Sequence, residues 1–118
     1  MDQKAPYDLQ YLNELSAGDH SFVLEMIKHF CSNAGDSLDR MNDLTTKQDW
    51  GSLREVVHKF ASNLNLIGLH EAAATSVRLE YITENREGLD QVPDLVAGIR
   101  ASVEMAVVKL SEDYPFEK

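Results

Sequence analysis

His58 is the residue of this sequence with the clearest chemical potential. It lies within residues 53–68, where apolar residues spaced four and three apart indicate a helix with one buried seam, formed by Leu53, Val57, Phe60, Leu64 and Ile67. On this helical wheel His58 falls about 140° from the middle of the seam, so we expect its imidazole to face solvent. With an unperturbed pKa near 6.5, an exposed imidazole often has a free nitrogen lone pair at neutral pH and can act as nucleophile or base.

The outward face of this predicted helix carries small and polar side chains around the histidine. Arg54 lies one turn before His58, and Ala61 and Ser62 lie one turn after it. Since Ala61 and Ser62 are small, nothing bulky covers that flank, and another molecule can approach the imidazole closely. The plain alternative is that His58 is a solvated side chain without a role, as most surface histidines on helices are.

Helical periodicity extends over most of the chain, and the sequence shows no strand-like alternation. The spacing of apolar residues predicts a short N-terminal helix and four long ones, over residues 7–15, 19–44, 49–68, 69–86 and 93–110. Asp19 and Asp49 are suited to cap the starts of two of these helices. Gly68 is suited to the left-handed position that ends the His58 helix. Because the connections are short, neighbouring helices should be antiparallel.

These elements predict an all-α fold, an antiparallel up-down four-helix bundle with a short additional N-terminal helix. We expect a single domain over residues 1–118, with its core roughly at residues 8–112. The helix over 19–44 should bury a stripe formed by Val23, Met26 or Ile27, Phe30, Ala34, Leu38, Met41 and Leu44. The helix over 69–86 should pack closely through small residues and fill the core with Val77, Leu79 and Ile82.

Composition and charge exclude several classes of function. The chain has 118 residues, of which 20 are acidic and 11 basic, which gives a net charge of −9. Such a chain repels phosphate backbones and anionic lipid, so we expect neither nucleic-acid nor membrane binding. The single Cys31 cannot form an internal disulfide and fits the reducing cytosol. Without a run of 18 apolar residues, the sequence predicts a cytoplasmic protein, most simply a monomer.

Metal and hydrolase chemistry have little support in the sequence. Glu55 and His58 have the Glu-x-x-His spacing used by di-iron bundles, but such sites need two of these motifs and two further glutamates. Only one such motif is present, on the outward face, so we expect no metal site. The sequence also lacks a nucleophile elbow, a P-loop, a cysteine pair and a glycine-rich phosphate cradle.

The run DWGSLREVVHKFASNLNLIGL over residues 49–69 resembles a histidine phosphotransfer (HPt) domain, the module that relays phosphoryl groups in two-component signalling. The family signature is a histidine followed by a lysine three residues on, a glycine four on and a glycine ten on. His58 and Gly68 match its first and last positions, whereas Ala61 and Ser62 replace the lysine and the first glycine. Further matches are Asp49-Trp50, the Leu53 and Val57 seam, and a Leu79-Glu80 pair, so that the resemblance covers roughly residues 10–112.

The resemblance implies that His58 is the phosphoacceptor, which receives a phosphoryl group from the phospho-aspartate of a receiver domain. In the family the lysine helps to bind the phosphoryl group and the glycine leaves room for it, so the two departures bear on transfer efficiency. Arg54, Lys59 and the Ser62 hydroxyl are candidate donors to the phosphoryl oxygens, with Arg78 a weaker one. Their alternative role is that of ordinary solvated residues. The resemblance places the Mg²⁺ for transfer on the receiver, so this chain needs no cofactor of its own.

The expected partners are the receiver domains of response regulators, a hybrid histidine kinase, or both. Ala61, Asn65 and Leu66 beside the histidine should form the docking patch. On this interpretation the protein is a phosphoryl carrier rather than a classical turnover enzyme. A first alternative is an HPt-like adaptor that binds receiver or kinase partners without carrying phosphate. A second is a structural bundle with no partner surface.

Overall fold

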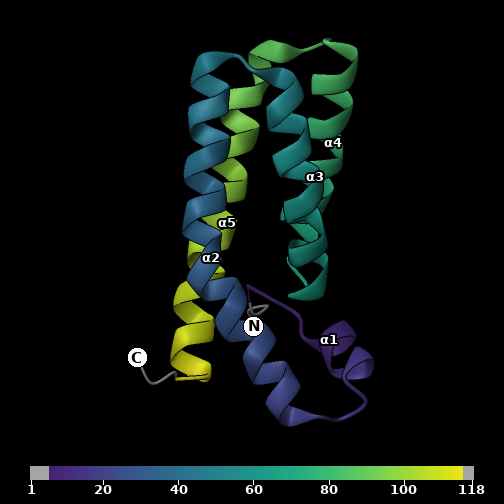
Figure 1. Cartoon of the computed structure of the whole chain (residues 1–118), viewed down its shortest axis with the longest axis vertical. Helices are drawn as coiled ribbons and strands as arrows, with labels where there is room; N and C mark the ends of the chain where they lie inside the picture. Colours follow the sequence, from purple (N-terminus) through teal and green to yellow (C-terminus); the bar gives the residue numbers. More distant parts are fainter. Residues whose placement is uncertain (1–5, 116–118) are drawn as a thin grey trace, which may run out of the picture.

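A computed structural model describes residues 6–115, in which all regular structure is helical (Figure 1). Its elements are α1 (Gln10–Leu15), α2 (His20–Lys47), α3 (Trp50–Leu66), α4 (His70–Asn85), the short 3₁₀ helix η1 (Leu89–Gln91) and α5 (Val92–Asp113). Helices α2 to α5 run alternately up and down, and α1 lies at their lower end. The predicted all-α up-down bundle with an additional N-terminal helix is therefore confirmed. The predicted domain also includes residues 1–5 and 116–118, which lie outside the described residues.

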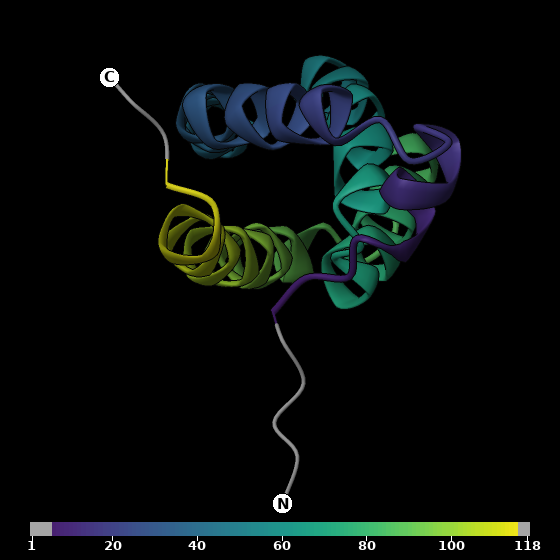
Figure 2. The same cartoon turned by 90° about the horizontal axis from the view of Figure 1, so that it is seen from below.

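The four long helices form a closed ring in which each helix packs against two others. Figure 2 shows α2 and α5 on one side of the bundle, α3 and α4 on the other, and α1 beneath α3 and α4. The most extensive contact joins α3 to α4. Within residues 6–115, no helix combines the length and the apolar character needed to cross a bilayer.

Aspartate side chains cap the N-termini of α2 and α3, as the sequence predicted. The Phe22 N–H donates to the Asp19 carboxylate over 3.1 Å, and the Ser52 N–H donates to the Asp49 carboxylate over 3.2 Å. These bonds satisfy backbone donors that have no partner within the first turn. Helix α2 extends three residues beyond its predicted end and stops where Gln48 adopts a left-handed conformation, with φ of 56°.

The N-terminal helix is shorter than predicted, because the residues before Gln10 fasten the chain to the bundle instead. The Asp8 N–H donates to the Ile67 carbonyl over 3.0 Å, and the Asp8 side chain accepts from the Gln10 N–H at the start of α1. The Tyr7 hydroxyl donates to the Asp113 carboxylate at the end of α5. This segment therefore contacts both the α3–α4 turn and α5, which a helix over residues 7–9 would prevent.

Gly68 ends the His58 helix in the predicted left-handed conformation, with φ of 72°. The structure adds a second requirement that the sequence did not reveal. A Cβ atom at Gly68 would overlap the carbonyl oxygen of Asp8, because the N-terminal segment passes directly against this turn. Glycine is thus needed both for its backbone conformation and for the close approach of another chain segment.

The core is formed by one apolar stripe from each long helix. The α2 stripe is as predicted, with Ile27 buried and Met26 only half-buried. Phe30 of α2 and Phe60 of α3 stack with ring centroids 6.1 Å apart, which joins these two helices. Such burial fixes the rotation of α3 about its axis, and so fixes which side chains it turns outward.

Helix α4 departs from the prediction at its core face. Its small residues are buried against α3 as expected, namely Ala72, Ala73 and Ser76. Val77, however, is 65% exposed, and the prediction that it fills the core is wrong. Thr83 is buried instead, with its hydroxyl donating to the Leu79 carbonyl over 2.7 Å. Because α4 packs against both α3 and α5, its buried face is broader than a single apolar seam, and its polar Thr83 is accommodated by a local hydrogen bond.

Candidate functional site

His58 lies in the middle of α3 and projects from its outer face. Its side chain is 74% exposed, as the helical wheel predicted. The adjacent Val57 and the nearby Phe60 are almost fully buried, so the backbone that carries the imidazole is held by the core. The structure thus presents an accessible imidazole on a rigid support.

The imidazole is oriented by a carboxylate from the neighbouring helix. Nδ1 of His58 lies 2.7 Å from Oε1 of Glu80 on α4, whose side chain is 24% exposed. An ionised carboxylate can only accept, so the ring donates its Nδ1–H to Glu80. In the neutral ring the lone pair is therefore on Nε2, the nitrogen that does not face Glu80. The arrangement provides a nucleophilic nitrogen open to an incoming molecule.

Glu80 is the residue of the candidate site that the sequence did not assign. In the sequence it stands out only as part of the Leu79-Glu80 pair that resembles the HPt family. The signal that could have found it is the hairpin around Gly68, since His58 precedes this turn by ten residues and Glu80 follows it by twelve. Two antiparallel helices of equal rise bring such positions level with one another.

The alignment of α3 with α4 also shows which residues lie opposite one another around His58. With His58 level with Glu80, Ala61 lies level with Val77 and Arg54 lies level with Glu84. Ala61 is half-buried, as befits a side chain next to α4, whereas Arg54 is exposed. On the outer face of α4, two large apolar side chains are exposed beside Glu80, namely Val77 at 65% and Tyr81 at 58%.

The opposite flank of α3 faces α2 and carries Lys59. This residue lines a groove of about 290 Å³ between α2 and α3. The structure therefore separates Lys59 from Ala61, which lies on the α4 flank. Within residues 6–115 neither Lys59 nor Arg54 forms an ion pair.

The remaining predicted site residues fall into two groups. Ser62 and Asn65 are exposed and share the outer face of α3 with His58. Leu66 is half-buried and packs against the core, so only part of its side chain is accessible. No three side chains of the metal-binding types converge anywhere in the part of the chain that the structure describes.

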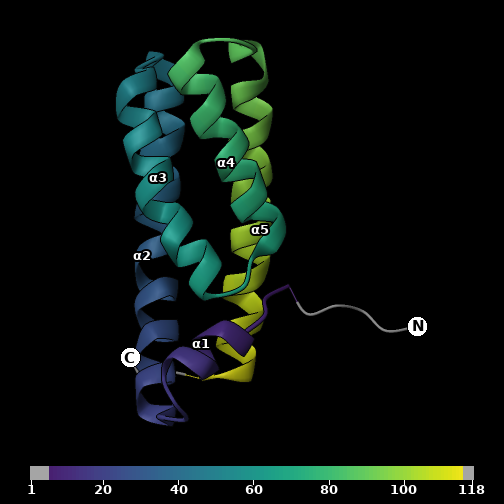
Figure 3. The same cartoon turned by 90° about the vertical axis from the view of Figure 1, so that its right-hand side faces the viewer.

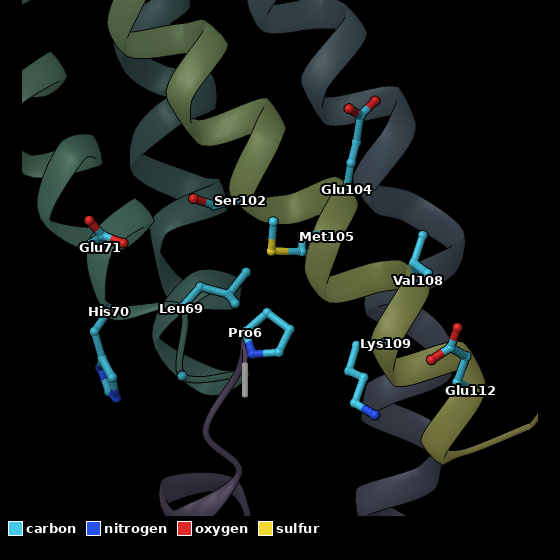
Figure 4. Close-up of a pocket in the computed structure, with 11 residues that line it drawn as sticks. Pro6, Leu69, His70, Glu71, Ser102, Glu104, Met105, Val108, Lys109 and Glu112 are labelled. Atoms are coloured by element: carbon cyan, nitrogen blue, oxygen red, sulfur yellow. The ribbon is translucent and has the colours of Figure 1, made fainter. Parts of the chain in front are cut away.

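A hollow of about 1210 Å³ lies apart from the histidine, between Pro6, the start of α4 and α5 (Figure 4). Its apolar lining includes Leu69, Met105 and Val108, and His70 points away from it. The His70 Nε2 atom instead lies 3.2 Å from Oδ2 of Asp8. His70 precedes Glu80 by ten residues of α4, or about 15 Å along the helix axis, so this hollow is not part of the His58 site.

A model of the protein family described as "Hpt domain" matches residues 25–107. The match begins within α2 and ends within α5, and so it covers well over half of the chain. It contains the whole of α3 and α4, and therefore His58 and Glu80, whereas α1 lies outside it. No curated protein and no solved structure matches the chain. The family match confirms the resemblance drawn from the sequence.

Proposed function

Because this chain belongs to the Hpt domain family, whose members act in phosphotransfer in two-component signalling, we propose that His58 carries a phosphoryl group between receiver domains. The observation that carries this proposal is the exposed imidazole whose Nδ1–H is held by Glu80. We also propose that the protein is cytoplasmic and monomeric. Its proposed partners are receiver domains, a hybrid kinase or both.

The proposed reaction is in-line displacement at phosphorus. Nε2 of His58 attacks the phospho-aspartate of a docked receiver, a P–N bond forms, and the P–O bond to the aspartate breaks with the carboxylate as leaving group. The ring keeps its Nδ1–H and becomes positively charged. In the reverse direction the carboxylate of a second receiver attacks phosphorus, and the neutral ring leaves. Neither direction requires a proton to move.

Glu80 favours this reaction through the charge that develops on the ring. As the P–N bond forms, positive charge spreads to Nδ1, which lies 2.7 Å from the Glu80 carboxylate. A carboxylate already in place stabilises this charge without reorganisation during the reaction. The same bond holds the ring in the tautomer whose lone pair is on Nε2.

We propose that Arg54 and Ser62 assist with the phosphoryl oxygens, because they are exposed and lie one turn to either side of His58. Lys59 lies on the flank of α3 that faces α2, whereas the position of the family lysine lies on the flank that faces α4. Lys59 therefore contributes to the surroundings of the site and does not replace the family lysine. The Mg²⁺ of the transfer is proposed to reside on the receiver.

The surface around the histidine is proposed to dock the receiver. In this surface Ala61 of α3 is a small residue, Asn65 is an exposed polar residue, and the half-buried Leu66 lies at the margin. Val77 and Tyr81 of α4 add exposed apolar area on the same side of the bundle as Glu80. Aromatic and apolar side chains of this kind are typical anchors of protein interfaces.

The proposal is tested by incubating the protein with a phosphorylated receiver and measuring intact mass and acid lability. Wild type should gain acid-labile phosphate, and His58→Ala should not. His20→Ala is the matched control, since His20 is exposed at the start of α2, and it should gain phosphate like wild type. Acid-labile phosphate on His58→Ala would contradict the proposal, as would an unlabelled wild type across the receivers of the source genome.

The adaptor alternative is favoured by one observation, the replacement of the family lysine and glycine by Ala61 and Ser62. An adaptor would bind receivers in calorimetry, with or without His58→Ala, and would acquire no phosphate. A carrier would bind in both forms and acquire phosphate only when His58 is present.

A further inference from the structure

The groove between α2 and α3 brings together two cations from different helices. Arg40 of α2 and Lys59 of α3 both line it, and both are exposed. In Figure 3 α3 lies in front of α2 along the upper part of the bundle, and the two helices are in contact. The rest of the lining combines polar side chains, the apolar Val56 and Phe60, and a single carboxylate, that of Glu55.

The charge of this groove contrasts with that of the rest of the molecule. The chain carries a net charge of −9, and within residues 6–115 four basic residues on other parts of the surface have acidic or amide partners, namely Lys47, Arg78, Arg100 and Lys109. Arg40 and Lys59 form no ion pair with any residue between 6 and 115. A local positive site on an acidic surface attracts anionic groups. An acidic partner is repelled less at this site than elsewhere on the surface.

We propose that Arg40 and Lys59 bind a carboxylate-bearing segment of the receiver domain and thereby select among receivers, an inference that rests on the proposed function. A guanidinium matches a carboxylate in a two-point hydrogen bond, and a lysine adds a point charge. A typical interface covers about 800 Å² on each partner. Since Lys59 is the residue next to His58 in α3, a receiver seated on the histidine also covers the groove.

The groove acts on the partner and not on the phosphoryl group. Lys59 projects about 100° around the helix axis from His58, towards α2. The imidazole is bonded to Glu80 on the opposite flank, towards α4. The two cations therefore lie on the α2 flank of α3, away from the bond to Glu80, where they affect docking.

The test compares two phosphoryl donors in charge-reversed variants. Arg40→Glu and Lys59→Glu should each lower the rate constant for transfer from a phosphorylated receiver about fivefold at low ionic strength. The effect should shrink in high salt, where exposed charges are screened. Lys28→Glu makes the same charge change on the exposed surface of α2, about 18 Å along the helix from Arg40, and should stay within about twofold of wild type.

A small phosphoramidate supplies the second donor, because it reaches His58 without docking. Arg40→Glu, which changes a residue of the neighbouring helix α2, should accept phosphate from it at the wild-type rate. Equal slowing with both donors would overturn the inference, as would receiver rates that match those of Lys28→Glu. The proposed function would survive either result, provided that wild type becomes phosphorylated.

Calorimetric binding of an unphosphorylated receiver makes the test independent of transfer. If wild type acquires no phosphate, the proposed function fails, but the groove is still tested. Weaker receiver binding by Arg40→Glu and Lys59→Glu than by Lys28→Glu supports the inference. Equal binding by all three variants overturns it.

Discussion

The Nδ1 atom of His58 lies 2.7 Å from Oε1 of Glu80, and this bond joins α3 to α4 at the candidate site. It assigns the hydrogen of the neutral ring to Nδ1 and the lone pair to the exposed Nε2. The nucleophilicity of a residue on one helix is therefore set by a residue on the next. The site belongs to the α3–α4 pair and not to α3 alone.

Removing this carboxylate should slow phosphoryl transfer to His58. We expect Glu80→Ala to lower the rate constant about tenfold, because a hydrogen bond to a charged group contributes about 1.5 kcal/mol at the low end of its range. Glu80→Gln should lose less, since its amide oxygen still accepts from Nδ1–H. Stopped-flow or quenched-flow transfer from a phosphorylated receiver measures both rates.

The imidazole tautomer distinguishes this role from a merely structural one. Nitrogen-15 NMR of wild type near pH 8 should show the Nδ1–H form of His58, and Glu80→Ala should shift the population towards Nε2–H. Glu84→Ala, one turn further along α4, is the control and should change neither the tautomer nor the rate. An unchanged tautomer in Glu80→Ala would contradict the assigned role.

Restoring the family lysine tests the consequence of Ala61. We expect Ala61→Lys to raise the transfer rate several-fold, because an ammonium one turn from His58 adds a charge-assisted hydrogen bond to the phosphoryl oxygens. Ala101→Lys, at an exposed alanine of α5, controls for the added charge. A slower Ala61→Lys would instead mean that the docking patch needs a small residue at this position.

The turn after α3 should tolerate only glycine. Gly68→Ala would place an L-residue at a φ of 72° and a Cβ atom against the Asp8 carbonyl. The left-handed conformation alone costs about 1–2 kcal/mol of unfolding free energy, and the overlap adds to it. Urea denaturation measures the loss. Gly35→Ala in α2 meets no neighbouring atom and should stabilise the protein by up to about 1 kcal/mol; equal effects of both changes would contradict this account.

The hydrogen bonds of the Asp8 carboxylate, which help to hold the N-terminal segment on the bundle, should weaken in acid. The Asp8 carboxylate accepts hydrogen bonds from the Gln10 N–H, which has the larger effect, and from the His70 ring, and these bonds hold the pKa of Asp8 below its usual range. A carboxyl group with a lowered folded-state pKa contributes stability above its unfolded pKa, and this stability is lost as the pH falls through the folded value. The loss should therefore appear below about pH 4.

Urea unfolding of wild type and Asp8→Asn at pH 6 and at pH 3 checks this expectation. The variant lacks the titrating carboxyl group, so the stability difference between the two proteins should be larger at pH 6. Asp36→Asn, at an exposed position of α2, controls for the loss of one negative charge. A difference that is the same at both pH values would contradict the role of Asp8.

Much of the fold could be predicted because helices are governed by local periodicity. The α2 stripe, the Asp19 and Asp49 caps and the exposure of His58 all follow from residues within a few turns of one another. Predictions were wrong where distant contacts compete with local pattern. Val77 is exposed despite its apolar side chain, and Tyr7 is drawn out of the predicted helix by Asp113.

The sequence by itself determined the helices, their order and the outward direction of His58, because each depends on spacing within one helix. Tertiary structure alone decided that Glu80 holds His58, that Arg40 and Lys59 line one groove, and that Asp8 lies against Gly68. Each of these pairs joins residues far apart in the chain. Their proximity depends on the register and rotation of packed helices, which the burial of the whole core sets jointly and no single segment encodes.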